Sequence, residues 1–321
     1  MRIVINLCGL GLGNNGGSRT LIRCAETMAR LGADVVIFSP DSASGEVLNH
    51  YTWHAPCAEV KIVGGARQPE ADVAIASGFL SVPSVCGSDA AVKVWYVRGF
   101  ELWQAGGDEG RLSEAFRKIR CVVCSEWLQR ELRRSGAEAE VVYPGLDFEW
   151  FYGTGGGREG AGALFHARHA TKRHGDAAAI AEAAGCGLEM LNRDLVDASP
   201  GQCREWYNGL RVWIAPTELE GLHNPPMEAG LCGCALVCTD HGRSGMSDYA
   251  LDGETAMVYP ARDVAAGAER VGALLRDEAL RTRLSGNLDR LLREKIGGRE
   301  RNMSRLLDML ESWRRGRRPE K

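Results

Sequence analysis

Two runs of alternating β-rich and helical segments, separated by a glycine-rich break, constrain the fold of this 321-residue chain most strongly. In the first half, short apolar runs such as 3–7 and 33–39 flank a stretch, 20–32, whose apolar residues recur at helical spacing. Strands that alternate with helices are typical of a parallel, doubly wound α/β sheet. Further strands expected in this half are 72–77, 92–97, 121–125 and 140–144.

The break covers residues 144–163, which have no sustained period and contain a run of glycines, as expected of a linker. The alternation then restarts and gives way to continuous helix after residue 263. We therefore expect an N-terminal domain (1–146), a C-terminal domain (147–300) and a C-terminal helix with a basic tail (301–321). Two α/β halves form a cleft, which is a favoured place for a ligand. The strands expected in the second half are 163–168, 187–191, 211–216, 234–240 and 256–260.

Composition excludes several classes of protein. The chain is 45% hydrophobic and 25% charged, so it is not disordered, and its net charge of −3 provides no field for nucleic acid. It has neither an apolar run of about 20 residues nor the features of a signal peptide, which predicts a cytoplasmic protein. Its eleven cysteines are expected to be free thiols, because Cys121 and Cys124 lack the second ligand pair of a structural zinc site. No metal is expected.

A glycine loop (9–18) follows the first strand and contains Gly11, Gly13 and Gly16 at the spacing of the dinucleotide fingerprint. Glycines there let backbone N–H groups approach an anion at a helix N-terminus, and a tight turn explains them equally well. An NAD(P)-dependent oxidoreductase is therefore an alternative, although Asp41 comes later than that fingerprint expects for its acidic residue. The residues of this loop expected to contact a donor are Gly13, Gly16 and Gly17.

The most informative segment is 218–237, which follows an expected strand and opens a helix whose first turn holds two prolines, as suits a helix start. Glu220 and Glu228 are separated by seven residues, so both can point into one cavity, where carboxylates would accept hydrogen bonds from ribose and sugar hydroxyls. Backbone amides at the helix start would stabilise a diphosphate. These amides belong to Gly221, Leu222, His223 and Asn224.

At these residues the chain resembles the group 1, family-4 glycosyltransferases, whose Glu-x7-Glu motif runs as an EGFGLPPLEA-like string, here EGLHNPPMEA (220–229). Segments 141–152 and 240–263 are also similar to that family. The resemblance implies a GT-B fold: two Rossmann-like domains facing a cleft, with the last helix crossing back to the first domain. It implies a retaining, metal-independent hexosyltransferase that needs no cofactor. Such an enzyme moves a sugar from a nucleotide-diphosphate sugar to a glycan, lipid-linked or small-molecule acceptor.

The resemblance also implies roles for individual side chains. Arg168 and Lys172, which follow the first strand of the second half, would hold the diphosphate and stabilise the leaving nucleotide. Fixed cations there supply the charge that a metal otherwise provides. Glu228 would bind the ribose, and Glu220 would contact the donor sugar and steady positive charge at the anomeric carbon.

The chain departs from the family at two places. His223 and Asn224 stand where the family usually has glycine and an apolar residue, which changes the lining near the donor sugar. Arg98 and Glu101 stand where many members place a histidine that faces the donor sugar. We expect Arg98 and Glu101 to contact the sugar or the acceptor, and the missing histidine keeps a non-catalytic nucleotide-sugar-binding protein open as an alternative.

The C-terminal segment 305–321 has an apolar stripe followed by arginines. It allows two expectations: peripheral contact with an anionic membrane surface, and packing of the stripe on the first domain.

Overall fold

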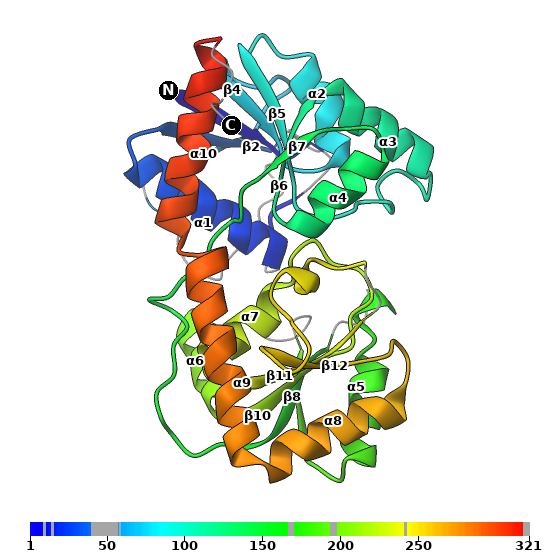
Figure 1. The fold of residues 1–321 in the computed structure, drawn as a ribbon. Helices are drawn as coiled ribbons and strands as arrows, with labels where there is room; N and C mark the ends of the chain where they lie inside the picture. Colours follow the sequence, from blue (N-terminus) through cyan, green and yellow to red (C-terminus); the bar gives the residue numbers. More distant parts are fainter. Residues whose placement is uncertain are drawn as a thin grey trace. The chain divides into compact units, whose positions relative to one another are not determined.

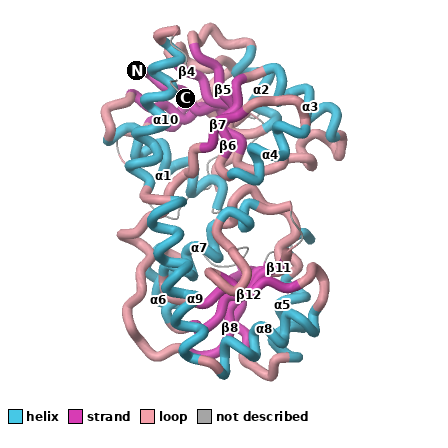
Figure 2. The backbone as a smooth tube through the Cα atoms, in the orientation of Figure 1, coloured by secondary structure: helices cyan, strands magenta, loops and turns pink. Residues whose placement is uncertain are grey.

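The computed structural model describes residues 1–8, 11–13, 16–39, 57, 59–165, 170–192, 198–240 and 243–316. The chain divides into two compact units (Figures 1 and 2). Unit 1 comprises Met1–Gly145 and Arg299–Lys321, and unit 2 comprises Leu146–Gly298. Within the described ranges, no helix is both long enough and apolar enough to cross a membrane.

Unit 1 is built on a seven-stranded, fully parallel sheet in the order β3-β2-β1-β4-β5-β6-β7. The central strands are buried on both faces, and their side chains are mostly valine and isoleucine, as is usual for a covered parallel sheet. The strands are β1 (Arg2–Asn6), β2 (Asp34–Phe38), β3 (Lys61–Val63), β4 (Val73–Ala76), β5 (Val92–Val97), β6 (Arg120–Val123) and β7 (Ala139–Val141).

The helices of unit 1 begin where the sequence supplies caps. Asp108 accepts hydrogen bonds from the first backbone amides of α3, and Ser125 does the same for α4. The helices are α1 (Gly16–Arg30), α2 (Val82–Cys86), α3 (Glu109–Lys118), α4 (Glu126–Arg134) and the short η1 (Phe79–Ser81).

The C-terminal helix α10 (Arg299–Arg314) also belongs to unit 1, as the resemblance implied, and it packs on α1 (Figure 1). At its start, Arg299 is 9% exposed and donates to the carbonyl of Pro144 at 2.8 Å. At its end, the guanidinium of Arg120 lies 4.4 Å from the ring centroid of Trp313. The apolar stripe of this helix is therefore used in packing; Leu306, Met309, Leu310 and Trp313 are buried.

Unit 2 holds a five-stranded parallel sheet in the order β12-β11-β10-β8-β9. Its core includes Ile180, Val212, Ile214 and Val237, all fully buried between the sheet and the flanking helices. The strands are β8 (Glu159–Phe165), β9 (Leu188–Asn192), β10 (Leu210–Ala215), β11 (Ala235–Thr239) and β12 (Ala256–Tyr259). The helices are α5 (His174–Ala183), α6 (Pro200–Asn208), α7 (Asn224–Leu231), α8 (Val264–Arg276) and α9 (Glu278–Leu291), with the short 3-10 helices η2 (Ala170–Lys172) and η3 (Gly245–Asp248) and the π-helix η4 (Leu292–Ile296).

Strand β8 begins at Glu159, inside the segment that the glycine run led us to interpret as a linker. Backbone pairing explains the difference, because the amide of Glu159 donates to the carbonyl of Gly209 and the strand pairs in parallel with β10. A Cβ at Gly162 would lie 2.3 Å from a side-chain carbon of Leu210. This glycine therefore serves close packing rather than flexibility.

Candidate active site

The carboxyl edge of the unit 2 sheet gathers four loops, which follow β8, β10, β11 and β12. Backbone hydrogen bonds join three of them: the amide of Glu218 donates to the carbonyl of Thr171 at 2.9 Å, and the amide of Gly245 donates to the carbonyl of Glu220 at 3.0 Å. In open α/β sheets, ligands bind outside the carboxyl ends of the strands. The predicted residues of unit 2 that the structure describes lie at this edge.

Lys172 and Glu220 meet here. Lys172 ends η2 after strand β8, Glu220 follows β10, and the lysine Nζ forms an ion pair with Glu220 Oε1. Both side chains are largely covered, with exposed fractions of 16% and 18%. Burial lowers the pKa of Lys172 to about 8, since desolvation disfavours the charged ammonium. The pair places a cation and a carboxylate together at the carboxyl edge of the sheet.

Glu228 has different surroundings. Helix α7 begins at Asn224 with Pro225 and Pro226 in its first turn, as the sequence predicts, and Glu228 follows in the next turn. Glu228 is 3% exposed, and the hydroxyl of Tyr207, on α6, donates to Glu228 Oε2 at 3.1 Å. No sequence pattern indicates Tyr207, because contact between α6 and α7 arises only from the fold.

The backbone between the two glutamates is tightly confined. Gly221, Leu222 and His223 are buried, and Asn224 is half-buried. A Cβ at Gly245 would lie 2.0 Å from the carbonyl oxygen of Gly221, so the loops after β10 and β11 can approach this closely only with glycine at 245. His223 takes a left-handed conformation, with φ of 65°.

A second carboxylate in the loop after β10 holds two arginines that sequence reasoning missed. Glu218 Oε1 lies 3.5 Å from Arg173 Nε and 2.7 Å from Arg262 Nε. Among the described residues other than glycine, a positive φ occurs only at Arg173, His223 and Arg262. All three lie at this edge of the sheet, which fits the tendency of backbone strain to cluster at functional sites. Arg168, predicted to bind the diphosphate, lies outside the described residues.

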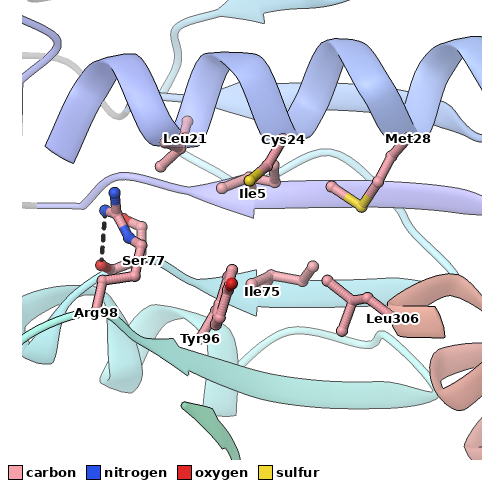
Figure 3. A pocket seen from close by; sticks show the side chains of 9 residues that line it. All are labelled: Ile5, Leu21, Cys24, Met28, Ile75, Ser77, Tyr96, Arg98 and Leu306. Carbon is pink, nitrogen blue, oxygen red and sulfur yellow. Dashed lines mark hydrogen bonds between the residues drawn. The ribbon is translucent and has the colours of Figure 1, made fainter. Parts of the chain in front are cut away.

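The glycine loop and Arg98 lie in unit 1. Gly16 and Gly17 open helix α1, and the amide of Gly13 donates to the Ser18 hydroxyl at 3.1 Å. The Arg98 guanidinium donates to the carbonyl of Gly17 and, at 3.2 Å, to that of Ser77 (Figure 3). Arg98 thus fixes the start of α1 against the end of β4, and its contact with a sugar stays a prediction.

Glu101 is 7% exposed and accepts a hydrogen bond from the amide of Phe79 at 2.6 Å, at the start of η1. Burial raises the pKa of Glu101 to about 7, partly opposed by this hydrogen bond and by Arg98. Glu101 interacts with Phe79 and Arg98, which both belong to unit 1. Its contact with a sugar or an acceptor stays a prediction.

The cavity beside Arg98 has a volume of about 20 Å³, room for about one water molecule and far too little for a nucleotide. Figure 3 shows its mostly apolar lining, to which α1, β1, β4, β5 and α10 contribute. The described residues also contain no group of three or more histidine, cysteine, aspartate or glutamate side chains arranged to hold a metal ion.

Comparisons with known proteins agree with this geometry. Residues 174–277, which include Glu218, Glu220 and Glu228, match the family Glycosyl transferases group 1. An 82-residue stretch is 32% identical to the capsular polysaccharide biosynthesis glycosyltransferase CapM of Staphylococcus aureus. That stretch covers 26% of this chain and 21% of CapM, so it spans about a fifth of that relative.

Solved glycosyltransferase structures share the fold over nearly the whole chain. Sucrose-phosphate synthase of Thermosynechococcus elongatus superposes with a TM-score of 0.75 at 14% identity, over 97% of this chain and 98% of that one. Anabaena HepE, in complex with UDP and glucose, gives 0.73 at 12% identity, over 97% and 100%. WaaG, a glycosyltransferase of lipopolysaccharide biosynthesis, gives 0.68 at 11% identity, over 97% and 99%. Residues 174–277 thus match the group 1 glycosyltransferases, as the motif indicated, and the solved structures confirm the GT-B fold.

Proposed function

We propose that the protein is a retaining, metal-independent glycosyltransferase that transfers a sugar from a nucleotide-diphosphate sugar. The observation that carries this proposal is the buried Lys172–Glu220 pair, which lies in the part of the fold where α/β proteins bind ligands. Glu228 lies in the second turn of α7, inside the matched family region. The oxidoreductase alternative rests on the glycine loop of unit 1 and leaves this arrangement unexplained.

In the proposed reaction, the bond between the anomeric carbon and the diphosphate oxygen breaks, and the acceptor hydroxyl oxygen forms the new bond on the same face. The hydroxyl proton leaves with the departing diphosphate. Negative charge develops on the leaving group, and Lys172, together with Arg168 as the resemblance implies, neutralises it. Glu220 stabilises the positive charge at the anomeric carbon, and Glu228 holds the ribose hydroxyls.

UDP is the first donor nucleotide to test, because HepE was solved with UDP and with UDP-glucose. The acceptor in the proposal is a glycan, a lipid-linked sugar or a small molecule. Peripheral membrane contact would rest on the arginines at the end of α10, since the apolar stripe of that helix is buried in unit 1. The residues beyond Gly316 lie outside the described part of the chain.

Thermal shift with UDP, GDP, ADP and dTDP tests donor binding. Ligand at 100 times its dissociation constant stabilises a protein by about 2.7 kcal/mol. One nucleotide should raise the Tm of the wild type and not that of Glu228→Ala, whereas Glu269→Ala, an exposed position on α8, should respond like the wild type.

Donor consumption in EDTA tests the reaction. Turnover that persists without divalent cations supports the proposal, and a strict Mg²⁺ or Mn²⁺ requirement contradicts it. Binding with neither transfer nor donor hydrolysis would favour the non-catalytic alternative, and stabilisation by NAD(H) alone would favour the oxidoreductase.

A further inference from the structure

His223 occupies a backbone conformation that rarely accepts a side chain. It precedes helix α7 with φ of 65° and ψ of 87°, in the left-handed region. Glycine adopts this conformation without strain, whereas a residue with a Cβ keeps it only where its surroundings impose it. The ring at position 223 is therefore retained despite a conformational cost.

The surroundings fix both the backbone and the ring. The buried hydroxyl of Tyr249 donates to the His223 carbonyl at 3.0 Å. The imidazole is 2% exposed, and its Nδ1 lies 3.3 Å from the Met246 sulfur. Both contacts come from segment 244–249, whose Gly245 packs against Gly221. The ring thus has little freedom to move.

The other edge of the ring faces the proposed catalytic carboxylate. His223 Nε2 lies 3.9 Å from Glu220 Oε1, the same oxygen that pairs with the ammonium of Lys172. Glu220 Oε1 therefore has two charged or polar neighbours, the ammonium of Lys172 and the imidazole of His223. The separation of 3.9 Å is longer than a hydrogen bond, so the ring acts on this oxygen as a close neighbour.

We propose that His223 is a positioning residue for Glu220. Its imidazole, held in place by Met246 and Tyr249, keeps Oε1 on Lys172 and thereby directs Oε2 toward the donor sugar. This inference rests on the proposed function, because it takes from there the role of Glu220 at the sugar. It adds a side-chain role at a position where glycine would satisfy the backbone.

Three variants separate the ring from the backbone. His223→Gly keeps the left-handed conformation and removes the ring. His223→Gln keeps an amide nitrogen near the place of Nε2, and His223→Asn keeps one near the place of Nδ1. We expect His223→Gly to lower kcat for donor turnover by about tenfold to a hundredfold, the cost of a misplaced group, with KM changed by less than about threefold. Gln should restore most of the loss, and Asn should not.

Wild-type kcat in His223→Gly would overturn the proposal, as would a Gln variant no better than Asn. If His223→Gly does not fold, the comparison of Gln with Asn decides, because Asn tolerates the left-handed conformation best among residues with a side chain. Coupling to Glu220→Gln is the third readout, since two residues acting through one carboxylate give non-additive effects.

A measurement without turnover separates failure of this inference from failure of the proposed function. The NMR signal of the Lys172 Cε methylene should shift in both His223→Gly and Glu220→Gln, without any donor present. A signal that moves with Glu220→Gln and not with His223→Gly refutes the positioning role. An enzyme that shows both shifts and turns over no nucleotide sugar would retain the positioning and lose the proposed reaction.

Discussion

The low pKa of Lys172 predicts that diphosphate affinity falls as pH rises above neutrality. Because burial lowers this pKa to about 8, about nine-tenths of the lysine is charged at pH 7 and about one-tenth at pH 9. The phosphate groups of UDP are already ionised in this range, with a second pKa of about 6. The uracil N3–H begins to ionise toward pH 9, and uridine, which carries the same base, corrects for this change. If only the ammonium form binds the diphosphate, the ratio of the Kd for UDP to the Kd for uridine should rise about tenfold between pH 7 and pH 9, following the loss of charged Lys172.

Calorimetric titrations with UDP and with uridine at pH 7, 8 and 9 measure this effect. Uridine lacks the diphosphate and carries the same base, so its Kd reports the effect of uracil ionisation alone. Lys172→Arg keeps its charge throughout the range and should abolish the pH dependence. Lys118→Arg, at an exposed position in unit 1, should leave it unchanged. A flat profile for wild-type UDP binding, or an equal slope in Lys172→Arg, would refute the assignment of Lys172 to the diphosphate.

Three further predictions concern stability. Gly245→Ala should lower the Tm and weaken UDP binding, because its Cβ would lie 2.0 Å from the Gly221 oxygen. The control Gly286→Ala lies within α9 with open space around it, and it should stabilise the folded protein by up to about 1 kcal/mol. Tyr207→Phe should cost about 1–3 kcal/mol in urea unfolding, because it removes the hydroxyl that donates to buried Glu228; an unchanged midpoint would contradict this. Finally, burial raises the pKa of four thiols to about 12, so these thiols lose their protons in the unfolded chain first. The free energy of unfolding should therefore fall as pH rises above 9, by up to about 1.4 kcal/mol per pH unit for each thiol. A Cys-to-Ala change at one of them should reduce the slope of the unfolding free energy against pH. These thiols are Cys121, Cys232, Cys234 and Cys238.

The sequence predicted those features that depend on local chemistry. The double proline placed the start of α7, and the spacing of apolar residues placed α1 after the first strand. The glycine run led to a wrong prediction of where β8 begins, because composition alone does not distinguish a flexible glycine from one that a neighbouring side chain requires. Gly162, packed against Leu210, is of the second kind.

The contacts within the site depended on topology that the sequence does not state. Lys172 and Glu220 are 48 residues apart, and they meet because β8 and β10 are neighbours in the sheet although β9 lies between them in the chain. Tyr207 reaches Glu228 for a similar reason, since α6 packs on α7. Motif spacing identified Glu220 and Glu228, but their partners required the strand order.

The loop after β10 carries two carboxylates, Glu218 and Glu220, and the loop after β8 carries two consecutive cations that pair with them. Lys172 pairs with Glu220, and Arg173 with Glu218. A buried cation without a partner is costly, and an opposite charge offsets much of that cost. The ammonium of Lys172 has three N–H donors, so it can bind a diphosphate oxygen while it stays paired with Glu220. In the proposed reaction Lys172 would therefore join the diphosphate to Glu220, and His223, which lies at the same Oε1, would keep the carboxylate in that arrangement.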